Sequence, residues 1–197
     1  MKRGYVYTIV FMFLVSAVFT LFLAGTNVLM APRIADNARF EEQQSLLNAL
    51  NLDDQGTTEE IDQRFKDFVK PVEGGEFLYY QSVDSSGAVQ GYAVPFTGAG
   101  LWGTIRGWLA VNPELNELQG IVFTEQNETP GLGGRIMEDW FKEQFRGLKL
   151  EAGQAVAYGE AGSQKIDAIS GATQTSNAII RIINQVKNEV LPKVEVK

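Results

Sequence analysis

The sequence predicts an α+β protein in which an N-terminal transmembrane helix precedes a single domain with a twisted, mainly antiparallel sheet packed by helices. Three observations lead to this prediction. An uncharged apolar run lies near the N-terminus, two pairs of alternating segments follow it, and an amphipathic stripe lies near the C-terminus. Strands in consecutive pairs, followed by helices, are typical of the α+β class.

The apolar run comprises Tyr5–Ala24 and contains no charged residue. As a helix, a run of about 20 residues spans about 30 Å, the thickness of the hydrocarbon core of a bilayer. Lys2 and Arg3 precede it, so the positive-inside tendency predicts a cytoplasmic N-terminus, although Arg33 and Arg39 on the far side weaken that prediction. We therefore expect a single-pass protein of the inner (cytoplasmic) membrane with its domain on the extracytoplasmic side.

A cleaved signal peptide is the alternative interpretation of this segment. Ala24 and Gly25 are small residues of the kind found near a cleavage site. The apolar run is longer than the usual core of a signal peptide, which favours a retained anchor.

We expect three segments along the chain: a membrane anchor over 1–30, a helical stalk region over 31–70, and an extracytoplasmic domain over 71–197. In the stalk region, Thr57 and Glu60 have the spacing of a capping box. This spacing predicts a short surface helix that ends near residue 69.

Alternating apolar and polar residues predict four strands that form two hairpins. The residues of Asp84–Gly87 suit the tight turn of the first hairpin, and residues 112–117 join the strands of the second. The predicted strands are Glu76–Val83, Ala88–Val94, Thr104–Val111 and Leu118–Thr124.

A stripe of apolar residues at helical spacing follows the strands, over residues 135–145. The spacing predicts one helix that packs on the core, in preference to a cofactor-binding helix. The stripe consists of Ile136, Met137, Trp140, Phe141 and Phe145.

The composition excludes several kinds of site. The chain contains no cysteine and no histidine. It can therefore form no disulfide and provide no thiolate for an iron–sulfur cluster, and it lacks the commonest zinc ligand, the usual haem ligand and the usual general base. Any redox chemistry in this chain therefore requires an organic cofactor, and we expect no metal site.

The charge of the chain argues against a nucleic-acid partner. The formal net charge is −7, and Lys2 and Arg3 are the only charged residues among the first thirty. The remaining 15 of the 17 basic side chains and all 24 acidic ones therefore follow residue 30. Such an acidic segment repels nucleic acid, which we exclude as a ligand.

Two glycine-rich loops lie between the predicted strands and helices, at Phe96–Gly103 and Glu128–Gly134. Glycine lets a backbone approach a flat ligand closely, because it has no Cβ. Neither loop has the spacing of a dinucleotide-binding fingerprint or of a nucleoside-triphosphate phosphate loop. Taken alone, each loop is slightly better explained by an ordinary turn than by a ligand-binding role.

The stretch Asp167–Ser176 runs directly into an apolar stripe of helical spacing. It therefore lies at a helix N-terminus, where unpaired N–H groups and the helix dipole favour a phosphate group. The alternative is that Thr173, Thr175 or Ser176 is only an N-cap, which the local physics by itself favours. The stripe consists of Ile179, Ile182, Ile183, Val186 and Val190.

Three motifs occur in order along the chain: Gly-Leu-Trp-Gly from Gly100, Glu-Thr-Pro-Gly-Leu-Gly from Glu128, and Ser-Gly-Ala-Thr-Gln-Thr-Ser from Ser170. Behind one N-terminal anchor, they resemble the covalent-FMN subunits of two complexes. These are the G subunit of the Rnf ion-translocating electron-transport complex and the C subunit of the sodium-pumping NADH:quinone oxidoreductase. The compact length of this chain is more similar to that of the Rnf G subunit.

The resemblance implies that Thr173 carries FMN through a phosphoester bond, attached outside the cytoplasm by a flavin transferase that uses FAD and magnesium. The phosphate would accept hydrogen bonds from the N–H groups of Thr175, Ser176 and Asn177. The other residues implied at the site are Asp167, Ser170, Gly171 and Ala172, with Thr175 and Ser176, near the phosphate, and Leu101, Trp102, Gly103, Glu128, Thr129, Gly131, Leu132 and Gly133 near the flavin ring.

The implied function is that of a membrane-anchored flavoprotein subunit that relays electrons, without independent catalysis, in an Rnf-type ferredoxin:NAD oxidoreductase complex. Its implied partners are the membrane and redox subunits of that complex, the flavin transferase and membrane lipid. The C subunit of the quinone-reducing complex is the first alternative. The second is a membrane-tethered module that binds a phosphate ligand reversibly and has no redox role. A hydrolase using Ser170 or Thr173 is disfavoured because the chain has no histidine.

Overall fold

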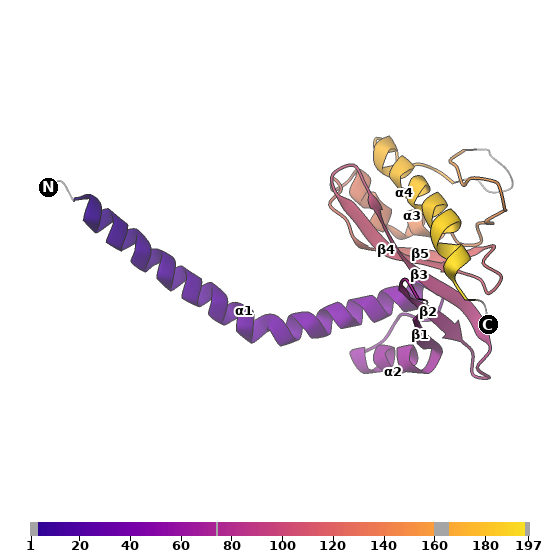
Figure 1. Ribbon diagram of the computed structural model, residues 1–197, viewed down its shortest axis with the longest axis horizontal. Helices are drawn as coiled ribbons and strands as arrows, with labels where there is room; N and C mark the ends of the chain where they lie inside the picture. Colours follow the sequence, from indigo (N-terminus) through magenta and orange to yellow (C-terminus); the bar gives the residue numbers. More distant parts are fainter. Residues whose placement is uncertain (1–3, 74, 160–165, 196–197) are drawn as a thin grey trace. The chain divides into compact units, whose positions relative to one another are not determined.

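The computed structural model describes residues 4–73, 75–159 and 166–195. The chain divides into two compact units, Met1–Glu41 and Glu42–Lys197, which we describe separately. The elements (Figure 1) are α1 (Tyr5–Ala49), α2 (Thr58–Phe68), β1 (Val69–Glu73), β2 (Leu78–Val83), β3 (Val89–Ala99), β4 (Thr104–Val111), β5 (Leu118–Glu125), the 3₁₀ helix η1 (Gly133–Met137), α3 (Asp139–Glu143), α4 (Thr173–Gln185), the π-helical turn η2 (Val186–Val190) and the 3₁₀ turn η3 (Leu191–Lys193).

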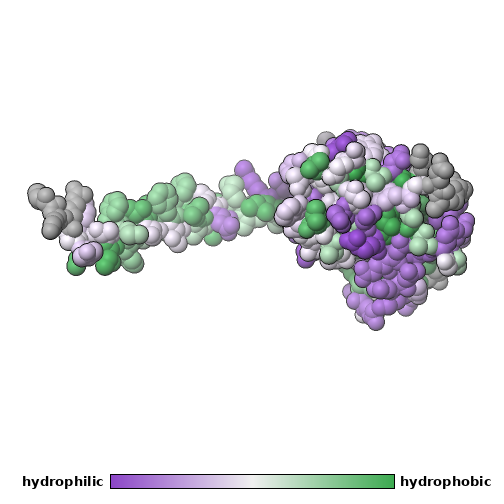
Figure 2. Space-filling view, turned by 90° about the horizontal axis from the view of Figure 1, so that it is seen from above, coloured by the Kyte–Doolittle hydropathy of each residue, from purple (hydrophilic) through white to green (hydrophobic). Residues whose placement is uncertain are grey.

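The first unit contains most of α1, and its side chains are exposed on every side. The apolar surface of this helix is visible in Figure 2. Phe13 and Leu21, for example, are well exposed. The helix is long and apolar enough to cross a membrane. It continues through residues 30 and 31 without a break, so the expected boundary between anchor and stalk falls inside one helix.

The last turns of α1 belong to the second unit and are part of its core. Leu46 and Leu47 are fully buried. The helix ends in a Schellman motif, because Asn51 has a left-handed φ of 57° and the N–H of Leu52 donates to Leu47 O at 2.9 Å. The guanidinium of Arg146 completes this end by donating to Asn48 O at 2.9 Å.

The capping box predicted for the next helix is confirmed. The N–H of Thr57 donates to the Glu60 carboxylate at 2.8 Å, and the N–H of Glu60 donates to the Thr57 hydroxyl at 3.3 Å. The first of these bonds holds the pKa of Glu60 below its usual value. The helix that follows, α2, ends at Phe68, as the sequence predicts to within a residue.

The five strands form one antiparallel sheet in the order β1-β2-β3-β4-β5. The four predicted strands are all present. The edge strand β1 was not predicted, because Pro71 lies inside it and proline cannot donate to a ladder; an edge strand tolerates this defect. Strand β3 also continues five residues beyond the predicted end at Val94.

The extension of β3 determines where the first glycine-rich loop lies. Beyond Val94, β3 pairs with β4 only, up to the pair Ala99 and Thr104. The two strands therefore form a ribbon whose tip is the turn at residues 100–103. The N–H of Gly100 closes this turn by donating to Gly103 O at 2.8 Å.

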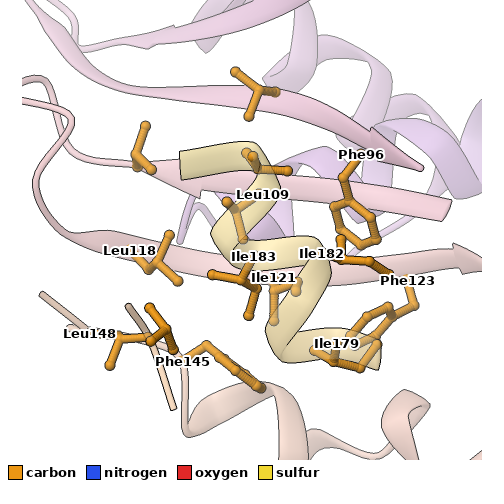
Figure 3. Packing of buried hydrophobic residues seen from close by; sticks show 14 of the residues in the cluster. Phe96, Leu109, Leu118, Ile121, Phe123, Phe145, Leu148, Ile179, Ile182 and Ile183 are labelled. Atoms are coloured by element: carbon orange, nitrogen blue, oxygen red, sulfur yellow. The ribbon is translucent and has the colours of Figure 1, made fainter. Parts of the chain in front are cut away.

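The core lies between this sheet and α4 (Figure 3). Ile179 and Ile183 are fully buried, as the stripe predicts. Gly98 of β3 lets α4 approach, because a Cβ at that position would overlap Ile182. Phe96 and Phe123 add an edge-to-face pair with ring centroids 5.8 Å apart.

The single helix predicted over 135–145 is wrong. The chain forms η1, breaks at Glu138, whose ψ is 143°, and starts again as α3. The break changes which side chains face inward. Ile136, Phe141 and Phe145 are buried as predicted, whereas Met137 and Trp140 are 43% and 40% exposed.

Candidate functional site

The turn between β3 and β4 presents two large apolar side chains to solvent. Leu101 is 53% exposed and Trp102 is 69% exposed. Their N–H groups point inward and donate to Glu128, so the backbone of the turn is fixed while the side chains remain free. Apolar side chains held in this way can cover a flat ligand.

The second glycine-rich loop follows β5 and folds around one carbonyl group. Thr129 O accepts from the N–H of Leu132 at 3.1 Å and from the N–H of Gly134 at 3.0 Å. Gly131 provides the left-handed turn with a φ of 75°. The side chain of Leu132 is 44% exposed, as a third apolar group on a glycine-rich loop.

The start of α4 is not capped by any of the three hydroxyl residues, so the N-cap alternative is wrong. Ala172 occupies the N-cap position, and no side chain makes a capping bond there. Thr173 is the first helical residue and is exposed. Within the residues that the structure describes, no acceptor is found for the N–H groups of Thr173, Gln174 and Thr175.

These free N–H groups lie slightly earlier in the chain than the sequence predicts. The N–H of Ser176 donates to Ala172 O at 2.9 Å, and Asn177 lies within the helical ladder. Of the three expected donors, only Thr175 has an N–H without an acceptor among the described residues. The reason is that the N-cap of α4 is Ala172, one residue before Thr173, the first of the hydroxyl residues.

Thr175 and Ser176 are buried and serve the structure around the helix start. The hydroxyl of Thr175 donates to the Glu128 carboxylate. The hydroxyl of Ser176 accepts from the N–H of Ile169 at 3.0 Å, and Ser176 O accepts from the hydroxyl of Tyr158 at 2.9 Å. Burial raises the pKa of Tyr158, so its hydroxyl keeps its proton and remains a donor.

The residues before α4 alternate between the core and the surface. Ile169 and Ala172 are buried, whereas Asp167, Ser170 and Gly171 are exposed. Gly171 makes a left-handed turn with a φ of 77°. The exposed residues of the motif are therefore accessible to a second protein.

The side-chain amide of Gln144 holds the first residue of this segment. Its Oε1 accepts from the N–H of Asp167 at 2.7 Å, and its Nε2 donates to Asp167 O at 3.4 Å. Gln144 follows α3 directly, so it links the segment before α4 to α3. Nothing in the sequence pattern indicated this contact.

One buried carboxylate brings the three motifs together. Glu128 is 4% exposed. Its Oε1 accepts from the N–H groups of Leu101 and Trp102 at 2.9 and 3.0 Å. Its Oε2 accepts from the hydroxyl of Thr175. The sequence indicated that Glu128 belongs to the site but not that it joins the loops to the helix.

Glycines allow these segments to touch. A Cβ on Gly133 would lie 2.5 Å from Thr175 Oγ1 and 2.9 Å from Glu128 Oε2. A Cβ on Gly100 would lie 2.5 Å from Glu128 Oε1. Both glycines are therefore required by contacts within the protein, in addition to any ligand.

The resulting surface fits a ligand with an anionic end and a flat apolar end. The anionic end suits the free N–H groups and the exposed hydroxyl at the start of α4. The flat end suits the exposed side chains of Leu101, Trp102 and Leu132. Gly171 lies close to Leu132, since a Cβ built on Gly171 would be 3.3 Å from Leu132 Cδ2, so the two ends of the surface are near each other. FMN has both features. Among the described residues, no group of acidic side chains could hold a metal ion.

Comparison with known sequences finds similarity to FMN-binding proteins over part of the chain. Residues 100–188 match the FMN-binding domain family. The C subunit of the Na(+)-translocating NADH-quinone reductase of Pasteurella multocida is 39% identical over 107 residues, which are 51% of this chain and 41% of that protein. The G subunit of the ion-translocating oxidoreductase complex of Methanosarcina acetivorans is 34% identical over 119 residues, which are 56% of this chain and 61% of that protein. The chain thus matches less than two thirds of the length of either relative.

Solved structures confirm the predicted fold. The C subunit of the Na(+)-translocating NADH-quinone reductase of Parabacteroides distasonis is 25% identical, with a TM-score of 0.66 over 83% of this chain and 96% of that one. NqrC of Shewanella oneidensis is 23% identical, with a TM-score of 0.68 over 77% of this chain and 93% of that one. The sequence matches, together with these structures, confirm the resemblance to G and C subunits of ion-translocating oxidoreductases.

Proposed function

We propose, on the premise that residues 100–188 form an FMN-binding domain, that this chain is the membrane-anchored flavoprotein subunit of an Rnf-type ion-translocating oxidoreductase. FMN, when bound, supplies the reversible acceptance and donation of electrons. The chain itself holds and orients the cofactor. The absence of cysteine and histidine is consistent with this division of roles.

Thr173 is the attachment residue in this proposal. The observation that carries it is the exposure of Thr173 at a helix start where, among the described residues, three N–H groups have no acceptor. A flavin transferase with magnesium would transfer the FMN phosphoryl group from FAD to this hydroxyl. The new bond joins Thr173 Oγ1 to phosphorus, the pyrophosphate bond of FAD breaks, AMP leaves and the hydroxyl proton is released. The free N–H groups then stabilise the negative charge of the phosphoester.

The flavin ring would lie over the two glycine-rich loops. Leu101, Trp102 and Leu132 offer exposed apolar surface, and Thr129 and Gly131 complete the second loop. Gly103 and Gly133 let these loops pack closely, because a Cβ on Gly103 would meet the side chain of Asn127 and a Cβ on Gly133 would meet Thr175 and Glu128. Attachment through the phosphate leaves the ring free to exchange electrons and keeps the cofactor at a permanent local concentration.

The long apolar helix α1 anchors the protein in the membrane, with the N-terminus in the cytoplasm and the domain outside. The partners are then the membrane and redox subunits of the same complex. Both named relatives are subunits of ion-translocating or Na(+)-translocating oxidoreductases, which supports this assembly.

The C subunit of a quinone-reducing complex is the second candidate. The identity to the Pasteurella multocida protein is higher, at 39%, but the match covers only 41% of that protein. The match to the Methanosarcina acetivorans protein covers 61% of its length, and this greater coverage favours the Rnf G subunit. Affinity purification from membranes distinguishes the two, through the identity of the copurified subunits.

Mass spectrometry of the chain, produced together with a flavin transferase, tests the attachment. We expect one FMN phosphoryl adduct on the wild-type chain and none on Thr173→Ala. Gln174→Ala is the matched control, because Gln174 is the next exposed residue of the same helical turn. The control should retain the adduct. An adduct that survives Thr173→Ala would refute the proposal, and flavin fluorescence lost from a denaturing gel would indicate reversible binding.

A further inference from the structure

Glu128 is unusual among the site residues because the protein itself uses both of its carboxylate oxygens. Oε1 accepts from the N–H groups of Leu101 and Trp102, and Oε2 accepts from the hydroxyl of Thr175. The side chain is 4% exposed. Glu128 therefore acts on a ligand through the segments that it holds.

These segments lie at opposite ends of the proposed ligand. Leu101 and Trp102 belong to the loop assigned to the flavin ring. Thr175 lies in the same first turn of α4 as Thr173, the proposed attachment residue. A single side chain thus connects the ring loop to the attachment helix.

We infer that Glu128 is the positioning residue of the flavin site, and that it fixes the ring loop relative to the helix that carries the cofactor. This inference rests on the proposed attachment of FMN to Thr173. Attachment by itself would hold only the phosphate end. The link through Glu128 gives the ring a fixed surface on which to lie, so that its distance from an electron partner is constant.

The link between the ring loop and α4 depends on the side-chain oxygens of Glu128. Alanine has no such oxygen, whereas glutamine keeps one of them. In Glu128→Ala, two partly buried N–H groups and one buried hydroxyl lose their acceptor, which disfavours the closed loop. In Glu128→Gln, the amide oxygen can accept from the two N–H groups, and the amide nitrogen can donate to the Thr175 hydroxyl. The glutamine variant should therefore rescue the link.

Circular dichroism in the visible flavin bands tests the inference, because a freely rotating ring gives little signal. We expect Glu128→Ala to keep the FMN adduct, since the Thr173 hydroxyl stays exposed, but to lose most of the flavin dichroism. Glu128→Gln should retain it. Glu125→Ala is the matched control: it removes an exposed carboxylate three residues away that pairs with Arg106, and it should leave the dichroism unchanged.

Amide hydrogen exchange gives a second readout that needs no flavin. The N–H groups of Leu101 and Trp102 should exchange about tenfold faster in Glu128→Ala than in the wild type, as expected for the loss of hydrogen bonds to a charged acceptor. Unchanged exchange of these two groups would overturn the inference. If Glu128→Ala does not fold, Thr175→Val breaks only the helix side of the link and should lower the dichroism by itself.

The outcomes separate the two proposals. A wild-type chain without an FMN adduct would refute attachment at Thr173, and amide exchange would still decide whether Glu128 holds the loop. A Glu128→Ala chain that carries the adduct and keeps the full flavin dichroism would refute only the positioning role of Glu128.

Discussion

At the residue scale, the hydroxyl groups near the start of α4 have different roles that their spacing does not reveal. Thr173 is exposed and lies where a helix favours an anion, whereas Thr175 and Ser176 are buried and bond to other parts of the protein. Of the three hydroxyl residues in the first turn of α4, Thr173 is therefore the one accessible to the proposed modification. The two substitutions should therefore have different effects: Thr175→Val disturbs the structure, whereas Thr173→Ala removes only the proposed attachment point.

Glycine at position 133 is predicted to be required for packing. Gly133→Ala places a Cβ 2.5 Å from Thr175 Oγ1, so the link between Thr175 and Glu128 must shift. Overpacking of this kind costs about 1–3 kcal/mol in the free energy of unfolding. Chemical denaturation in detergent measures the loss. Gly134→Ala is the control, because the nearest atom to its Cβ, Thr129 O, is 3.3 Å away, and an equal loss in both variants would contradict the prediction.

At the element scale, the turn between β2 and β3 depends on one carboxylate. Asp84 accepts from the hydroxyl of Ser86 at 2.6 Å and from the N–H groups of Ser86 and Ala88 at 2.8 and 3.0 Å. The hydroxyl of Ser86 is the main cause that holds the pKa of Asp84 below 3.8, followed by these N–H groups. The carboxylate therefore stabilises the hairpin only while it is ionised.

The sign of the pH dependence follows from this lowered pKa. Between the folded and unfolded pKa values of Asp84, the unfolded chain binds more protons, so stability rises with pH. The contribution is complete above 3.8 and is lost as the pH falls through the lower, folded value. We expect the stability difference between the wild type and Asp84→Asn to shrink below pH 3.8. An NMR titration midpoint of Asp84 at or above 3.8 would contradict this.

The elements that the sequence predicted well are those with a strong local signal. Thr57 and Glu60 form their capping box, and β4 has its predicted bounds. The errors lie where tertiary packing overrides the local pattern. Glu138 adopts an extended conformation inside a stripe of helical spacing, and Pro71 obscures a short edge strand. Such features depend on what packs against them.

At the scale of the whole molecule, the sequence indicated the three motifs of the candidate site but not how they connect in the fold. Glu128 bonds to the loop residue Leu101, 27 positions away, and to Thr175, 47 positions away. Both contacts arise because the β3–β4 ribbon, the loop after β5 and the start of α4 meet in the folded domain. A periodic pattern carries no information about such pairings, whereas each of the three motifs is a short run of consecutive residues that can be read directly from the sequence.

The orientation of the chain in the membrane is the remaining prediction at this scale. Because the chain has no cysteine, a single introduced cysteine can be labelled without background. Gln63 lies on the exposed surface of α2, and Gly4 precedes α1 next to the two basic residues of the N-terminus. In right-side-out vesicles, a membrane-impermeant maleimide should label Gln63→Cys directly.

Gly4→Cys should react with the same reagent only after detergent opens the vesicles, since Lys2 and Arg3 are predicted to hold the N-terminus on the cytoplasmic side. The reverse labelling pattern would contradict the orientation and would place the flavin site on the same side as cytoplasmic donors. Loss of the Gly4→Cys label even in detergent, with a shortened chain by mass spectrometry, would instead show that the apolar segment is cleaved. In that case α1 could not hold the flavin domain at the membrane, and the other subunits would have to do so.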